Sequence, residues 1–155
     1  MVITLLVISA FNTATVFGAS ASFSVSGGGT YNVGDTVRIT YTYSADSLGI
    51  ATTTLKYNPT ILQYQSCSGG TAPTSAAGEI PIVAGDGNLL KTISVTVTFK
   101  ALKTGSSTIS FSHIDVLDYD GNPLSVPSKS TTVTVTNSSS SASGNANLAS
   151  LSVSA

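Results

Sequence analysis

The sequence predicts an all-β fold, an antiparallel jelly-roll β-sandwich of eight to nine strands with the general shape of an immunoglobulin domain. Ser, Thr, Val and Gly dominate the 155 residues, while helix-favouring Glu, Lys and Gln are scarce. Apolar and hydroxyl side chains alternate over short runs, which is typical of strands with one buried face. Turn-forming residues separate these runs, so neighbouring strands are expected to be antiparallel.

Before the first of these runs, residues 1–21 are expected to form a secretory signal peptide. An apolar stretch ends in small residues, with Ala19 and Ala21 in the A-x-A arrangement of a cleavage site. The alternative is a transmembrane anchor, but polar residues from Asn12 to Thr15 interrupt the stretch before it reaches the roughly 20 apolar residues of a bilayer span. We therefore expect secretion, cleavage after Ala21 and no membrane association afterwards.

The first half of the domain contains four runs with strand periodicity. In the second run, Val37, Ile39, Tyr41 and Tyr43 share the inward face, and the hydroxyl residues between them share the outward face. The turn sequences "YNVGD" and "YNPT" lie between the runs. The four predicted strands are residues 23–27, 36–44, 51–57 and 61–67.

The second half contains four more runs, at residues 79–85, 92–102, 107–117 and 130–136. The third of these changes phase, because Ile109 and Phe111 have one parity while Ile114 and Val116 have the other. An odd step moves side chains to the opposite face of a strand. We therefore expect a β-bulge or bend near residues 112–113.

The pattern stops after residue 136. Residues 137–146 are rich in Ser and too poor in apolar residues to pack, which predicts a flexible linker. Alternation resumes at residues 147–155 with Leu148, Leu151 and Val153. A lone strand cannot bury its apolar face, so this segment is expected to begin a truncated second module. The first module thus spans residues 22–136.

Few residues are suited to catalysis, and we expect no enzyme and no cofactor. His113 is the only histidine and Glu79 the only glutamate, which leaves no credible triad or carboxylate pair. A net charge of −1 without a basic cluster argues against nucleic-acid binding. Cys67 is the only cysteine, so its expected role is that of a small buried hydrophobe, with pairing between chains as the alternative.

The stretch "DVLDYDGNPLS" carries the highest density of carboxylates in the chain, which raises the question of a calcium loop. With Gly121 aligned to the glycine of an EF-hand loop, its first and twelfth positions fall on Val116 and Pro127, which lack carboxylates. No metal site is therefore expected. A surface site using Asp118, Asp120 and Asn122 is the weaker alternative to a hairpin turn.

Three segments together resemble a bacterial cohesin domain. They are "YNVGDTVRITYTY", "LKYNPTILQYQSC" and "GDGNLLKTISVTVTFKALKTGSSTISFS", and their order and spacing match the family's pattern over residues 22–136. Separately, "NANLASLSVSA" is similar to the opening of the cadherin-like β-sandwich repeats of bacterial surface proteins.

The cohesin resemblance implies a nine-stranded jelly roll that docks the dockerin module of another protein, in a setting of polysaccharide breakdown. Dockerins carry calcium themselves, so docking could need calcium without any ion bound to this chain. The family docks through strands three, five, six and eight. Only "SGGTAPTSAAG" precedes "EIPIVAG", so strands five and six are expected to be shortened or merged. Transferred to this chain, the docking residues are Thr52, Thr54, Lys56, the "EIPIV" run, Ser110 and Ser112.

Two other functions stay open. A carbohydrate-binding module would share the fold, but it usually needs a planar row of aromatic residues to stack on sugar rings. The chain has no Trp, and only Tyr31 and Tyr119 lie in turns. A structural spacer in a surface protein would suit the Ser-rich linker equally well and predicts no exposed apolar patch.

Overall fold

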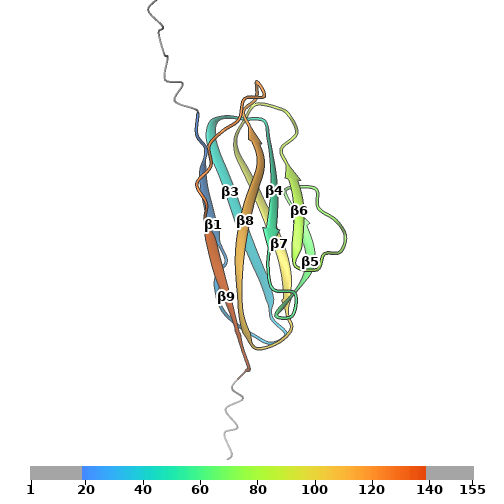
Figure 1. Ribbon diagram of the computed structural model, residues 1–155. Helices are drawn as coiled ribbons and strands as arrows, with labels where there is room; N and C mark the ends of the chain where they lie inside the picture. The colour runs from blue at the N-terminus through green and yellow to red at the C-terminus, as the bar shows by residue number, and fades with distance from the viewer. Residues whose placement is uncertain (1–18, 139–155) are drawn as a thin grey trace, which may run out of the picture.

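The computed structural model describes residues 19–138, which form two β-sheets packed face to face (Figure 1). The four-stranded sheet has the order β1-β3-β7-β5 and the five-stranded sheet the order β2-β9-β8-β4-β6. None of the described residues forms a helix with the length and apolar character needed to cross a bilayer. The strands are β1 (Ser22–Ser26), β2 (Gly29–Asn32), β3 (Thr36–Leu48), β4 (Ile50–Lys56), β5 (Leu62–Ser68), β6 (Glu79–Ala84), β7 (Leu90–Ala101), β8 (Gly105–Leu117) and β9 (Ser130–Thr136).

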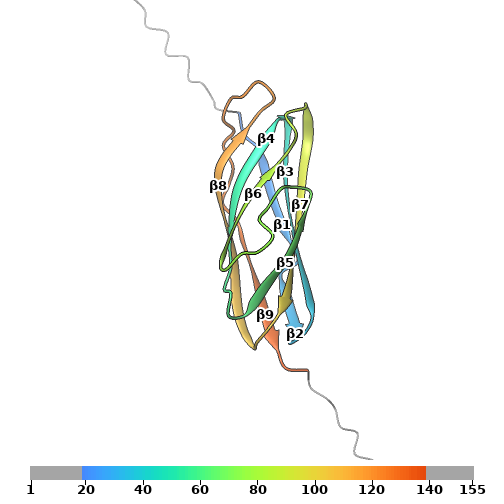
Figure 2. The same ribbon diagram turned by 90° about the vertical axis from the view of Figure 1, so that its right-hand side faces the viewer.

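The core lies between the sheets and is built from the predicted inward faces. In β3 the side chains of Val37, Ile39, Tyr41 and Tyr43 are all at most 1% exposed, as their alternation with hydroxyl residues predicted. β7 lies beside β3 in the same sheet and adds its own apolar residues to the core. The register between the two strands is continuous from Thr36 to Ser44. Figure 2 shows the two layers from the side, and the buried apolar residues form one cluster. The all-β jelly-roll sandwich is confirmed.

One strand pairing differs from the predicted antiparallel arrangement. β2 lies parallel to β9, with Tyr31 opposite Val135. The sequence predicted a turn here, because a strand of only four residues is too short to show alternation of apolar and polar side chains. β2 is held by its neighbours instead: the Tyr31 hydroxyl donates a hydrogen bond of 2.8 Å to the Gly27 carbonyl.

The predicted irregularity in β8 is present, one residue beyond its expected place. Thr52 of β4 faces Asp115, whereas the next residue, Thr53, faces His113, so Ile114 has no partner across the ladder. Parity grouped Ile114 with Val116, but Val116 is buried and Ile114 is 58% exposed. The grouping was wrong because the extra residue of a bulge leaves the alternation of its strand.

A buried chain of polar groups lies behind this bulge. The Tyr43 hydroxyl is 2.5 Å from the Thr53 hydroxyl and 2.8 Å from Nδ1 of His113. Burial raises the pKa of Tyr43 to about 12, against a smaller lowering by its Thr53 hydrogen bond. Burial also lowers the pKa of His113, with a smaller opposing contribution from the Pro127 backbone. The hydroxyl of neighbouring Tyr41 is buried without a hydrogen-bond partner among residues 19–138, and burial raises its pKa further.

The described part begins inside the predicted signal peptide. Ala21 is 2% exposed, and its amide donates to the Ser125 carbonyl at 2.9 Å. The Ser125 amide in turn donates to the carbonyl of Ala19 at 3.0 Å. Residues 19–21 therefore pack as part of the sandwich. Residues 1–18, most of the predicted linker and the predicted second module lie outside the described residues.

Candidate protein-docking face

The structure places Thr52, Thr54, Lys56, Ser110 and Ser112 together on the outward side of β8, β4 and β6. Of the predicted "EIPIV" run, Glu79, Pro81 and Val83 are exposed, whereas Ile80 and Ile82 are buried in the core, because alternate residues of a strand face opposite sides. β4 is the middle strand, paired to β8 on one side and to β6 on the other, so its outward residues each lie between two neighbours. We call this surface the β8–β4–β6 face. Its three rows, each read from β8 through β4 to β6, are Ser110–Lys56–Glu79, Ser112–Thr54–Pro81 and Asp115–Thr52–Val83.

The two ends of this face differ in chemistry. At one end, Nζ of Lys56 lies 2.9 Å from Oε1 of Glu79, and since both side chains are more than half exposed the pair contributes little to stability. At the other end, Val83 is 41% exposed and lies in the same row as the carboxylate of Asp115. Ile114, next to Asp115 in the chain, has no partner across the ladder and is 58% exposed. This end therefore offers apolar area and a carboxylate that forms no ion pair with the described residues.

At its β6 side the face ends in an edge strand that has, among the described residues, only one further backbone pairing beyond it. Beyond β6, one isolated bridge joins Thr71 and Val83, with hydrogen bonds of 2.7 and 3.0 Å between their backbones. The shortened fifth and sixth strands expected from the sequence thus appear as β6 and this bridge. Pro81 has no amide hydrogen to donate, which suits a position on an edge strand.

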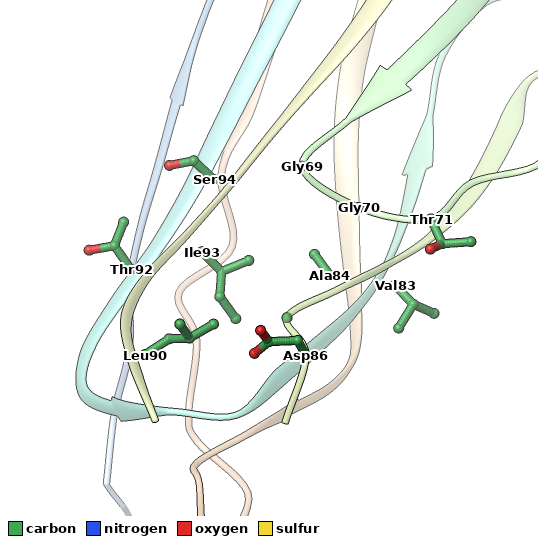
Figure 3. A pocket seen from close by; sticks show the side chains of 11 residues that line it. Gly69, Gly70, Thr71, Val83, Ala84, Asp86, Leu90, Thr92, Ile93 and Ser94 are labelled. Carbon is green, nitrogen blue, oxygen red and sulfur yellow. The ribbon is translucent and has the colours of Figure 1, made fainter. Parts of the chain in front are cut away.

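A groove of about 470 Å³ lies next to this edge, where β6 and β7 approach each other (Figure 3). Asp86 points toward Leu90 on β7. Hydrogen bonds from Asn88 lower the pKa of the Asp86 carboxyl. No aromatic side chain lines the groove, so it has no surface on which a sugar ring could stack.

The alternative metal residues form a turn. Oδ1 of Asp118 accepts a hydrogen bond of 2.8 Å from the Asn122 amide, and the Asn122 side chain donates to both carboxylate oxygens. These hydrogen bonds lower the pKa of Asp118. Within residues 19–138 no three carboxylate, histidine or cysteine side chains cluster as metal ligands would.

The remaining candidate residues lie apart. Tyr31 is on β2, whereas Tyr119 follows β8 at the opposite end of the sandwich, so the two do not form an aromatic strip. Cys67 is half-buried on β5, and burial raises the pKa of its thiol. Sequence reasoning missed Asp115 and Ile114 as members of the docking surface because their orientation depends on the bulge.

No family model and no curated protein matches this chain. Several solved structures are similar to it in fold, among them three cohesin structures. A complex of CaDoc0917 with CaCohA2, a cohesin–dockerin complex, matches with 18% identity and a TM-score of 0.65, covering 76% of this chain and 100% of the other. A non-cellulosomal cohesin from the archaeon Archaeoglobus fulgidus has 18% identity and a TM-score of 0.61, covering 76% and 91%.

The third is the cohesin module of a family 33 glycoside hydrolase from Clostridium perfringens. It has 15% identity and a TM-score of 0.65, covering 77% of this chain and 98% of the other. The fold of residues 19–138 is therefore a cohesin-like β-sandwich.

Proposed function

We propose that this chain is a secreted, non-catalytic interaction module of the cohesin type. Its β8–β4–β6 face docks a dockerin-like module of a partner protein, within a polysaccharide-degrading or cell-surface assembly. The observation that carries the proposal is the convergence of the predicted docking residues on one exposed sheet face of a cohesin-like sandwich.

The chemistry of the face supports a protein partner. Val83 and Ile114 expose apolar side chains among hydroxyl groups and one unpaired carboxylate. Apolar contacts surrounded by polar groups are the usual composition of a protein interface. A purely structural spacer would leave no such patch exposed.

A carbohydrate ligand is less well supported. Tyr41, Tyr43, Tyr57 and Tyr64 are buried in the core, and Tyr31 on β2 and Tyr119 after β8 lie at opposite ends of the sandwich. The groove beside β6 contains no aromatic residue. Stacking on sugar rings therefore has no platform among the described residues.

The proposal is tested by isothermal titration of the protein with purified dockerin modules, including CaDoc0917, in calcium and in chelator. We expect binding by at least one dockerin in calcium and its loss in chelator, because the calcium belongs to the dockerin. Absence of binding by every dockerin at about 100 μM, a weak limit for a specific complex, would refute the proposal.

Two arginine variants give the test its matched control. Thr54→Arg places a bulky cation at the centre of the β8–β4–β6 face and is expected to weaken binding at least tenfold. Ser24→Arg changes an exposed residue of β1 in the other sheet and is expected to leave binding unchanged. Equal effects of the two variants would contradict docking at this face.

A further inference from the structure

The charges of this chain are separated along its long axis. All thirteen Asp, Glu, Lys and Arg residues lie within the described part, and their net charge is only −1. At the end where β3 and β8 finish and β4 and β7 begin, five carboxylates and Lys91 give a net charge of −4. The rest of the sandwich carries five cations and two carboxylates, a net charge of +3.

Three turns meet at the acidic end, so its charges belong to one surface. Asp46 and Asp118 line the same pocket, and the Tyr119 amide donates to the Ser47 hydroxyl at 3.2 Å. The turn that carries Asp86 joins them, because the Gly87 amide lies 3.3 Å from the Gly49 carbonyl. The acidic end comprises Asp46, Asp86, Asp115, Asp118 and Asp120, together with Lys91.

The opposite end is assembled in the same way. The Gly34 amide donates to the Ala101 carbonyl, and the Leu102 amide donates to the Ile61 carbonyl, at 2.9 and 2.8 Å. Lys100 and Lys103, both exposed, flank this junction. Asp35, whose carbonyl accepts a hydrogen bond of 2.9 Å from the Ala101 amide, is the carboxylate beside them. The described chain enters at the acidic end and leaves at this basic end (Figure 1).

Each end also exposes large apolar side chains beside its charges. At the acidic end, Leu89 is 62% exposed and Tyr119 54%. At the basic end, Val33 is 40% exposed and Leu102 44%. Complementary charge steers two surfaces together, and buried apolar area then stabilises their contact.

We propose that the acidic end of one copy of this chain docks on the basic end of a second copy. The contact is head-to-tail, so a pair of copies keeps one free acidic end and one free basic end, and association continues into strings rather than stopping at a symmetric dimer. β3, with thirteen residues, spans about 40 Å. That exceeds the screening length of about 10 Å at 0.1 M salt, so the two ends act independently.

The proposal predicts salt-dependent self-association, measured by analytical ultracentrifugation of the purified chain. Association is expected to be at least about tenfold tighter at 20 mM than at 500 mM salt, since screening weakens contacts between exposed charges. A wild-type chain that stays monomeric at about 0.5 mM protein and 20 mM salt, where even millimolar affinity is detected, would overturn the proposal.

Charge-reversal variants test which surfaces meet. Asp46→Lys with Asp120→Lys neutralises the acidic end, and Lys100→Glu with Lys103→Glu makes the basic end acidic. None of these four side chains makes a hydrogen bond or ion pair in the described structure, so the fold is expected to persist. Each double variant alone is expected to be monomeric, because it has lost one of the two complementary ends.

Mixing the two double variants is the decisive measurement. The first retains a basic end and the second an acidic end, so the mixture is expected to form one-to-one dimers and no longer species. As a control, Lys56→Glu with Glu79→Lys exchanges the pair on the side of the sandwich and is expected to associate like the wild type. A mixture that stays monomeric, or double variants that self-associate like the wild type, would overturn the proposal.

Discussion

Two adjacent inward tyrosines of β3 are expected to respond in opposite ways to the loss of their hydroxyl groups. The Tyr43 hydroxyl bonds to both Thr53 and His113, while the Tyr41 hydroxyl is buried with no partner. Tyr43→Phe and Tyr41→Phe each remove one oxygen from the core and leave the ring in place. Their effects on the free energy of unfolding therefore separate hydrogen bonding from packing.

The expected magnitudes follow from what each substitution leaves behind. Tyr43→Phe leaves the Thr53 hydroxyl and the His113 ring nitrogen without their hydrogen-bond partner, and Thr53 is only 1% exposed. Each buried polar group without a partner costs about 1 to 3 kcal/mol of stability. We expect a destabilisation of about 3 kcal/mol, or a melting temperature lower by roughly 10 °C. Tyr41→Phe removes a hydroxyl whose burial is not offset, and we expect a stabilisation of about 1 kcal/mol.

The assay is urea unfolding of both variants and the wild type at pH 7.5, followed by circular dichroism. Equal slopes of the unfolding free energy against urea would show that the variants differ in stability alone. A Tyr41→Phe variant that is as destabilised as Tyr43→Phe would refute the reasoning, because it would mean that the Tyr41 hydroxyl has a partner.

Three further predictions concern pH, backbone conformation and calcium. The pKa of His113 is lower in the folded than in the unfolded chain, so between the two values the unfolded chain binds more protons. Stability is expected to be full above about pH 6.5 and to fall as the pH drops, and urea unfolding of His113→Gln should lose this dependence between pH 7.5 and 5.5. Gly69→Ala is expected to cost at least twice as much in thermal unfolding as Gly87→Ala, which costs roughly 1 to 2 kcal/mol. Both have positive φ, but only at Gly69 would the Cβ meet a backbone atom, the Ser94 carbonyl oxygen at 2.1 Å. Calcium at millimolar concentration is expected to leave the melting temperature unchanged, because Asn122 already occupies both oxygens of Asp118; a rise would identify a calcium site there.

The strands of the core could be predicted because period-two alternation states directly which side chains are buried. β3 illustrates this, since four predicted inward residues are all buried in the structure. The two hydroxyl residues between them, Thr40 and Thr42, face outward and form hydrogen bonds to Thr96 and Ser94 of β7. Local pattern and tertiary position agree along this strand.

Two features could not be predicted because they depend on distant partners. β2 has too few residues to show a period, and its parallel pairing is set by where β9 returns to the sheet. Ala21 lies in the core because its backbone pairs with Ser125, which is about a hundred residues away in the chain. A segment that resembles a cleavage site gives no sign of such a contact.

The docking face was predictable in part. Outward parity and the cohesin resemblance identified Thr52, Thr54 and Lys56, and the register of β4 with its neighbours brings them into rows with β6 and β8. The contribution of Ile114 and Asp115 could not be predicted from the sequence, because a bulge changes the local backbone geometry and with it the direction of the side chains. The phase change in the sequence located that bulge to within a residue or two.

Docking of a partner on the β8–β4–β6 face would change the amide chemical shifts of that face, which NMR measures residue by residue. The labelled protein is titrated with the dockerin that binds it most tightly. We expect the largest shift changes in β4, β6 and the C-terminal half of β8, including Thr54 and Ile114. Changes concentrated in β1, β3, β5 and β7 instead would contradict docking on that face.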